Sequence, residues 1–348
     1  MGRTIEQMKK TGFSLALLLC LAFAGMLNAQ PGGLTIYWID TEGGAATLIV
    51  GPSGQSLLVD TGNPGPEDRD AKRIFEAAKL AGLSRIDMLL STHFHSDHVG
   101  GAPALAKMIP IGRFYDHGES IETSDPRAAQ LFDTYKAAAE GKRTTVKPGD
   151  KIPLPGTEVT VVISNGEPIA RPINGGGPNP LCQDAVRKDP DKTENQRSIG
   201  ILLTFGKFKF LDLGDLTWDK EMELACPVNK LGTVTLFQAT HHGFFGDFSG
   251  APAMIWAIQP QVVVVNNGAR KGLAANAYET LTKIPGIEGI WQSHRSARND
   301  DAHNTSEQMI ANVDPASDGH WIKAVVAKDG KFTLTNGRND FSKTYTAR

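Results

Sequence analysis

The chain of 348 residues is poor in cysteine and has no excess of basic charge. It contains 3 cysteines, and its 36 Lys and Arg residues are balanced by 38 Asp and Glu residues, which gives a formal net charge of −2. So few cysteines exclude a small disulfide scaffold, and this charge balance is not that of a strong nucleic-acid or membrane-surface binder. Cys182 and Cys226 are compatible either with a disulfide or with two buried thiols.

Long apolar runs are also scarce. The run at residues 13–26 is shorter than the roughly 20 residues that a membrane-spanning helix requires. It follows Lys9 and Lys10 and precedes Ala29, which is the pattern of a secretory signal peptide. We therefore predict a signal peptide over residues 1–29 and export to the periplasm or the extracellular space. A retained anchor or lipidation at Cys20 is the alternative.

The rest of the chain alternates strand and helix patterns. In the first half, strands are expected at 34–40, 46–51, 56–62, 85–93 and 111–118, and helices at 71–83 and 100–109. In the second half, strands are expected at 197–206, 207–215, 233–243, 260–268 and 287–294, with a helix at 275–283 and two closing strands. This β-α-β order predicts parallel strands with right-handed crossovers. Two β-rich halves with external helices predict an α/β fold, a four-layer αββα sandwich of two mixed sheets.

Residues 165–197 show neither a strand nor a helix period and are rich in Gly, Pro, Asn and charge. We expect a long surface loop there, either a functional lid or an insertion without function. Residues 30–348 are otherwise expected to form a single domain that carries this loop as an insertion.

The run HFHSDH places four metal-ligand side chains within six residues: His93, His95, Asp97 and His98. It follows an apolar strand and precedes a helix, so alternate side chains project the same way. His93 and His95 can share one ion, whereas Asp97 and His98 turn toward a second position. Imidazole and carboxylate are ligands that zinc prefers. With 9 histidines in the whole chain, a chance cluster is a poor explanation.

Further candidate ligands lie where other expected strands end. Asp215 closes one strand and could bridge two ions, and His241 and His242 close the next. His117 closes the strand at 111–118; since parallel strands bring their carboxyl ends to one edge, it could ligate a metal or contact the substrate, or it could be an ordinary loop histidine. Asp60 is expected to orient a ligand histidine.

These motifs occur together in a known order. DTG at 60–62, HFHSDH with VGG at 93–101, GD at 214–215 and HHG at 241–243 resemble the metallo-β-lactamase superfamily over about residues 34–295. The pattern is most similar to the branch with the ComEC competence-protein hydrolase domain. The resemblance implies an αββα fold, two zinc ions per chain, and a metal-activated water that attacks an ester, amide, lactone or phosphodiester bond.

The resemblance also implies a role for each motif residue. The first ion would be held by His93 and His95, the second by Asp97 and His98, with Asp215 as the bridge. Either His241 or His242 would complete the second site; His242 is favoured because it directly precedes Gly243, and the other histidine would face the substrate. Asp97 and His242 are the candidate catalytic residues, with Asp97 as the proton acceptor.

One family feature is missing. Many members add a further histidine to the first site, but this chain has no histidine between His117 and His241, so His117 is considered as a substitute. We expect an exported metal-dependent hydrolase that favours phosphodiesters, with Arg270 and Lys271 as candidate phosphate contacts. The alternatives are a lactonase or β-lactamase-type hydrolase of a small substrate and, from a different class, a non-catalytic metal-binding protein.

Overall fold

The computed structural model of the chain describes residues 32–246, 248–316 and 318–348. The predicted signal peptide lies outside these residues. Within the described part of the chain, no helix has the length and apolar character needed to cross a membrane.

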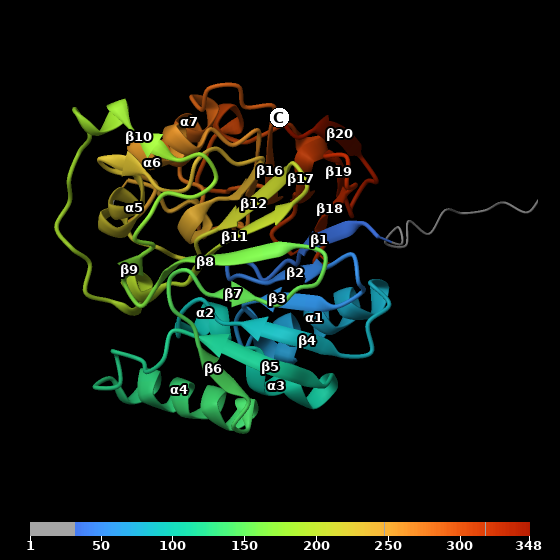
Figure 1. The fold of residues 1–348 in the computed structure, drawn as a ribbon. Helices are drawn as coiled ribbons and strands as arrows, with labels where there is room; N and C mark the ends of the chain where they lie inside the picture. Colours follow the sequence, from blue (N-terminus) through green and yellow to red (C-terminus); the bar gives the residue numbers. More distant parts are fainter. Residues whose placement is uncertain (1–31, 247, 317) are drawn as a thin grey trace, which may run out of the picture.

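The first sheet combines both ends of the described chain. Its strands are β1 (Leu34–Trp38), β2 (Thr47–Val50), β3 (Ser56–Val59), β4 (Ile86–Leu90), β5 (Ile111–Asp116), β6 (Arg143–Thr145), β18 (Ile322–Val326), β19 (Lys331–Asn336) and β20 (Ser342–Thr346). They are arranged in the order β20-β19-β18-β1-β2-β3-β4-β5-β6 (Figure 1). β3, β4, β5 and β6 run parallel to one another, as the β-α-β pattern predicted, and the remaining pairs are antiparallel.

The second sheet is formed by the middle of the chain. Its strands are β7 (Lys151–Ile152), β8 (Glu158–Ser164), β9 (Glu167–Pro168), β11 (Gly200–Phe205), β12 (Phe208–Asp212), β14 (Leu236–Gln238), β15 (Val262–Val265), β16 (Gly289–His294) and β17 (Ile310–Asn312). Their order is β17-β16-β15-β14-β12-β11-β8-β7, with β9 paired to β8. β11 and β12 form the predicted hairpin across Gly206 and Lys207. A separate small sheet pairs β10 (Gly177–Pro178) with β13 (Val228–Asn229).

Helices cover the outer face of each sheet. The helices of the first half are α1 (Arg69–Leu80), α2 (Ser96–Val99), α3 (Ala102–Met108) and α4 (Pro126–Ala139); those of the second half are α5 (Trp218–Ala225), α6 (Pro252–Ile258) and α7 (Ala275–Thr282). Figure 1 shows α1, α3 and α4 on one side of the two sheets and α5, α6 and α7 on the other. Short 3-10 helices lie at Pro66–Asp68, Pro180–Cys182, Glu194–Arg197, Thr240–Gly243, Asp301–His303 and Glu307–Met309.

The alternation of side chains along the strands explains the layers. In β1, Leu34, Ile36 and Trp38 belong to the core between the two sheets. Tyr37, between them in sequence, instead packs in the core under α1 and α3, because successive side chains of a strand point to opposite faces. The second sheet has an equivalent outer core beneath α5, α6 and α7. Both faces of each sheet are therefore buried, and the predicted four-layer αββα sandwich of mixed sheets is confirmed.

The segment 165–197 is irregular over most of its length, as predicted, apart from β9, β10 and two 3-10 turns. A disulfide between Cys182 and Cys226 ties this segment to the end of α5, with 5.6 Å between the Cα atoms. Of the two arrangements left open by the sequence, the structure has the disulfide.

Candidate metal centre

The first sheet supplies one half of the candidate site. β4 ends at Leu90, and the HFHSDH run follows as a turn that leads into α2. The side chains of His93 and His98 are fully buried, whereas His95 and Asp97 keep partial access to solvent. The turn between β4 and α2 thus places all four predicted ligands of this run at the carboxyl end of β4.

The second sheet supplies the other half. Asp215 follows β12, and His241 and His242 follow β14. Both histidines have a left-handed backbone, with φ of 52° and 54°, a conformation that costs free energy and is concentrated at functional sites. Two backbone hydrogen bonds hold this turn, from His241 N to Gly214 O at 3.0 Å and from Leu273 N to His242 O at 3.0 Å.

The two halves meet at a close approach between Gly214 and Thr92. Gly214 has a φ of +56°, and a Cβ atom placed on it would lie 2.8 Å from Thr92 Cβ. Only glycine combines this backbone conformation with such a contact. The loop that carries Asp215 can therefore lie directly against the loop that carries the histidines.

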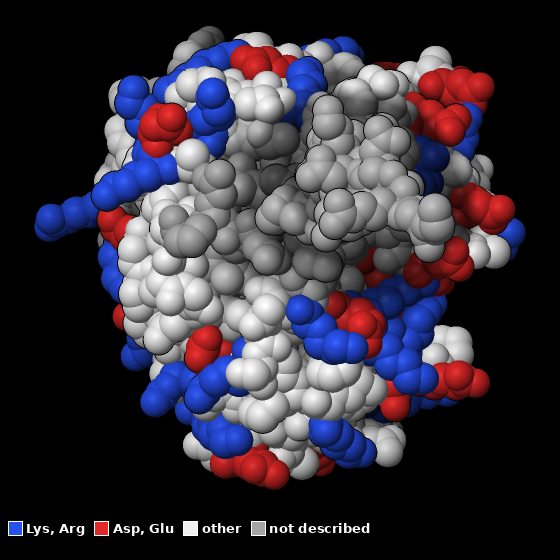
Figure 2. Space-filling view, turned by 90° about the vertical axis from the view of Figure 1, so that its right-hand side faces the viewer, with Lys and Arg blue, Asp and Glu red and all other residues white. Residues whose placement is uncertain are grey.

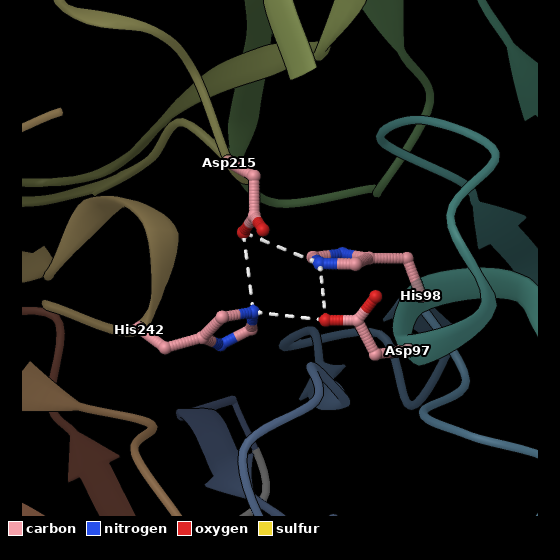
Figure 3. Close-up of side chains that lie close together, drawn as sticks. All are labelled: Asp97, His98, Asp215 and His242. Atoms are coloured by element: carbon pink, nitrogen blue, oxygen red, sulfur yellow. Dashed lines mark ion pairs between the residues drawn. The ribbon is translucent and has the colours of Figure 1, made fainter. Parts of the chain in front are cut away.

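Four side chains form a compact cluster of potential ligand atoms within 4.8 Å of one another: Asp97, His98, Asp215 and His242. Figure 3 shows them pointing toward one another from the two halves of the molecule. His242 Nε2 lies 3.3 Å from both Asp97 Oδ2 and Asp215 Oδ1, and His98 Nε2 lies 3.2 Å from Asp215 Oδ1. The structure thus brings together the residues expected to hold the second ion.

The electrostatics of the cluster suit a cation. Burial alone would raise the pKa of Asp215, but the neighbouring His241, His242 and His98 hold it well below its usual range. The pKa of Asp97 is likewise well below its usual range, because His98, His242 and Lys271 outweigh the effect of burial. Both carboxylates are therefore charged at neutral pH.

The two imidazole nitrogens that face the carboxylates of the cluster have no hydrogen bond. His98 Nε2 and His242 Nε2 are buried and have no hydrogen-bond partner among the residues that the structure describes, although carboxylate oxygens lie nearby. Buried polar atoms are rarely left unsatisfied in this way. Two charged oxygens and two such nitrogens in one place match the ligand set of a divalent metal ion.

His241 faces the other oxygen of the same carboxylate. Its Nε2 lies 3.3 Å from Asp215 Oδ2, whereas His98 and His242 face Oδ1. Its Nδ1 lies 3.2 Å from Ser249 Oγ, which itself donates to Leu216 O at 2.7 Å. Because Ser249 Oγ already donates its only proton to Leu216 O, it must accept from His241 Nδ1. The proton of the neutral His241 ring is then on Nδ1, and the lone pair of Nε2 points toward Asp215.

His93 and His95 form a second pair of facing nitrogens. His93 Nε2 lies 3.1 Å from His95 Nδ1, and His93 Nδ1 is contacted by Thr92 Oγ1 at 3.1 Å and Ser198 Oγ at 3.4 Å. Burial and the neighbouring His98 and His95 lower the pKa of His93 well below its usual value. His93 is therefore a neutral imidazole, the form that binds metals.

Asp60 contacts the ring of a cluster histidine, as the sequence predicted. Asp60 Oδ2 lies 2.6 Å from His98 Nδ1, and the same carboxylate accepts hydrogen bonds from Thr92 N at 2.7 Å and Thr92 Oγ1 at 2.8 Å. Burial lowers the pKa of His98, but the charges of Asp215 and Asp60 raise it well above its usual value.

His117 lies away from the compact cluster. Its Nε2 is 3.0 Å from Glu194 Oε2, and its ring packs against Phe94 at 4.6 Å between centroids. Lys271, considered as a phosphate contact, forms an ion pair with Asp97 Oδ2. Sequence reasoning missed Glu122 and Glu194, which contact His95 and His117, since isolated glutamates in loop segments carry no local signal.

The chain is similar to proteins of known family. Residues 39–189 match the family model of the metallo-beta-lactamase superfamily. A UPF0173 metal-dependent hydrolase of Cupriavidus metallidurans is 39% identical over 123 residues, 34% of this chain and 37% of that protein. An atrochrysone carboxyl ACP thioesterase of a Cryptosporiopsis species is 33% identical over 109 residues, 31% of each chain. The metallo-β-lactamase fold protein YhfI of Bacillus subtilis has 13% identity and a TM-score of 0.44, over 74% of this chain and 96% of that one.

The matched segment spans about a third of the length of these curated relatives. The segment 39–189 contains the HFHSDH run and the strand that leads into it, and the described residues have the four-layer fold. Residues 39–189 are therefore similar to the metallo-β-lactamase superfamily, and the chain has the metallo-β-lactamase fold. The resemblance to the ComEC branch stays a prediction.

Proposed function

We propose that this chain is an exported metal-dependent hydrolase that uses a metal-activated water at a binuclear zinc site and favours phosphodiester substrates. The observation that carries the proposal is the buried cluster of Asp97, His98, Asp215 and His242, whose ligand atoms converge within 4.8 Å. The relatives named as metal-dependent hydrolases support the same reaction class.

The residues divide into two ligand groups around one carboxylate. Asp97, His98, His242 and Oδ1 of Asp215 would hold one ion. His93 and His95 would hold the other ion. Oδ2 of Asp215 faces His241 and is not used by the first group, so Asp215 could bridge the two ions through its two oxygens. When bound, zinc lowers the pKa of water to about 7 and polarises the oxygen of the scissile group.

The chain's own residues would then orient the reaction. Asp97 combines charge with partial exposure at the cluster and is the candidate acceptor of the water proton. Asp60 keeps His98 Nε2 directed at Asp215 through its contact with Nδ1. His241 is 12% exposed, whereas His242 is fully buried, which supports His242 as the ligand and His241 as the ring nearer to substrate.

A cleft of about 800 Å³ beside His95 is the candidate substrate site, within the size range of small-molecule pockets. Its cations Arg127 and Lys192 have no side-chain partner among the described residues, whereas the acidic groups Glu122 and Asp125 are engaged with His95 and with the start of α4. Two unpaired cations in the cleft that His95 lines favour a substrate that carries negative charge, as a phosphodiester does.

The balance of 36 Lys and Arg against 38 Asp and Glu favours a small or short substrate over long nucleic acid. On the face shown in Figure 2, the Lys and Arg side chains that the grey atoms leave visible are interspersed with Asp and Glu and form no continuous basic surface. Non-specific binding of long nucleic acid requires such a surface. The similarity to a thioesterase makes acyl substrates the second candidate.

A substrate panel tests the proposal. The purified zinc-loaded protein is assayed with bis(p-nitrophenyl) phosphate, short DNA, a lactone, a thioester and a chromogenic cephalosporin, beside an Asp215→Ala variant. We expect phosphodiester turnover that the variant lacks. Turnover of acyl substrates alone would replace the phosphodiester proposal with the second candidate, and a metallated protein without turnover on any substrate would indicate a binding protein.

Export has its own test. The Cys182–Cys226 disulfide supports an oxidising compartment, since disulfides persist outside the cytosol. N-terminal sequencing of the protein recovered from periplasmic and culture fractions should show a chain that begins at Gln30. Recovery of the full-length chain in the cytosolic fraction alone would contradict export.

A further inference from the structure

A glutamate that the sequence did not single out contacts one of the candidate ligands. Glu122 lies in the segment between β5 and α4, and its Oε2 is 3.2 Å from His95 Nε2. The side chains are 29% and 30% exposed, so water shields this contact only in part. The segment therefore lies across the outer side of His95.

The contact determines which nitrogen of His95 is free. A neutral imidazole carries one proton, on one of its two nitrogens. If Nε2 carries it and donates to Glu122, Nδ1 keeps a lone pair, and Nδ1 is the atom that faces His93 Nε2 at 3.1 Å. The geometry of Glu122 thus selects the tautomer in which His95 and His93 can ligate the same ion.

Glu122 is itself held in place by the end of the 165–197 segment. Its Oε1 accepts a hydrogen bond from Glu194 N at 2.9 Å. The buried Glu194 carboxylate accepts from Ile121 N at 2.5 Å and lies 3.0 Å from His117 Nε2. Burial would raise the pKa of Glu194, but the hydrogen bond and charge of His117 lower it. The charged Glu194 therefore fixes the backbone next to Glu122.

We propose that Glu122 is a positioning residue that presents His95 Nδ1 to the ion shared with His93, and that Glu194 and His117 hold Glu122 in place. This gives His117 a supporting role in place of direct ligation. A histidine ligand that donates its second N–H to a carboxylate is better oriented and more basic. The inference rests on the proposed metal site.

The experiment measures zinc affinity of the full mature chain, by competition with a chromogenic chelator, for the wild type and for Glu122→Ala and Glu122→Gln. We expect Glu122→Ala to weaken one of the two ions by about 10–100-fold, the range for losing such a partner, and to leave the other unchanged. Glu122→Gln should lower the zinc affinity less, since the amide oxygen of glutamine can still accept a hydrogen bond from His95. Glu119→Gln is the matched control, because Glu119 is 75% exposed and contacts Arg143 instead.

A second variant separates positioning from a general structural effect. In a His95→Ala background, Glu122→Ala should cause no further loss of zinc affinity at the weakened position. A further loss of equal size there, or wild-type affinities in Glu122→Ala, would overturn the inference. A wild-type chain that binds no zinc would instead overturn the proposed function, so the two failures are distinguishable.

Discussion

Asp60 and His98 are 38 positions apart in the chain, yet Asp60 Oδ2 lies 2.6 Å from His98 Nδ1, with both side chains buried. This contact occupies one nitrogen of the ring and leaves His98 Nε2 for Asp215 and Asp97. This contact therefore connects the residue that follows β3 with a residue of α2.

Replacing Asp60 by Asn should weaken zinc binding by about 10–100-fold, because the carboxylate that orients His98 becomes a neutral amide. Asn tolerates the left-handed backbone of this position, where φ is 61°, so the fold should be retained. Zinc affinity from chelator competition is the measurement. Asp68→Asn is the control, since Asp68 is exposed and has a similar φ of 57°; equal affinities in both variants would contradict the role of Asp60.

The adjacent histidines should differ in their effect on metal content. His242→Ala removes a member of the compact cluster and should lower bound zinc by about one ion per chain. His241→Ala should retain that ion, because Asp97, His98, Asp215 and His242 remain. Plasma mass spectrometry of the purified variants gives the zinc content. The reverse result would assign the ligand to His241.

Glu221 should make stability depend on pH. It is fully buried on α5, with Oε2 accepting from Ala251 N at 2.8 Å, and burial raises its pKa to about 8. Between its ordinary value of 4.5 and about 8 the folded chain binds more protons at this group than the unfolded chain, so its contribution to stability declines as pH rises.

A Glu221→Gln variant should lack this decline. Its free energy of unfolding relative to wild type should increase from pH 5 to pH 8.5 by an amount on the order of a few kcal/mol, at about 1.4 kcal/mol for each pKa unit. Denaturant unfolding at both pH values is the measurement, with Glu223→Gln on the exposed side of α5 as control. A pH-independent difference would show that Glu221 does not titrate in this range.

The Cys182–Cys226 bridge should stabilise the folded chain mainly by restricting the unfolded one. The two cysteines are 44 positions apart, and closing a loop of this length is worth roughly 2–4 kcal/mol. The double variant Cys182→Ser, Cys226→Ser should lose that amount in denaturant unfolding. Reductant should destabilise the wild type and leave the double variant unchanged; sensitivity of the variant to reductant would contradict this explanation.

Much of the site could be predicted from local patterns. The HFHSDH run gathers ligand side chains within one turn, so its chemistry is visible without tertiary structure, and Asp215 and the HHG pair follow apolar strands. The strand expected at 233–243 ends at Gln238 instead, because His241 and His242 adopt a left-handed backbone that no strand period reveals. α4 was not predicted, although Asp125 before Pro126 is a helix-start signal.

The supporting contacts could not be predicted in the same way. Glu122 and His95 are 27 positions apart, and Glu194 and His117 are 77 apart. The first pair forms when the loop after β5 packs on the turn before α2, and the second forms when the segment before β11 packs on the residues after β5. A glutamate in a polar loop has no period or motif that distinguishes it from a solvated one, so its role follows only from the packed structure.

The pairing of β1 with β18 makes the first sheet depend on two segments that are far apart in the sequence. β1 is hydrogen-bonded between β2 and β18, and β18 begins only at Ile322. Until β18 is available, one edge of β1 has no partner and is open to other extended chains. A chain truncated before Ile322 would thus expose an unpaired strand edge that can pair with other extended chains.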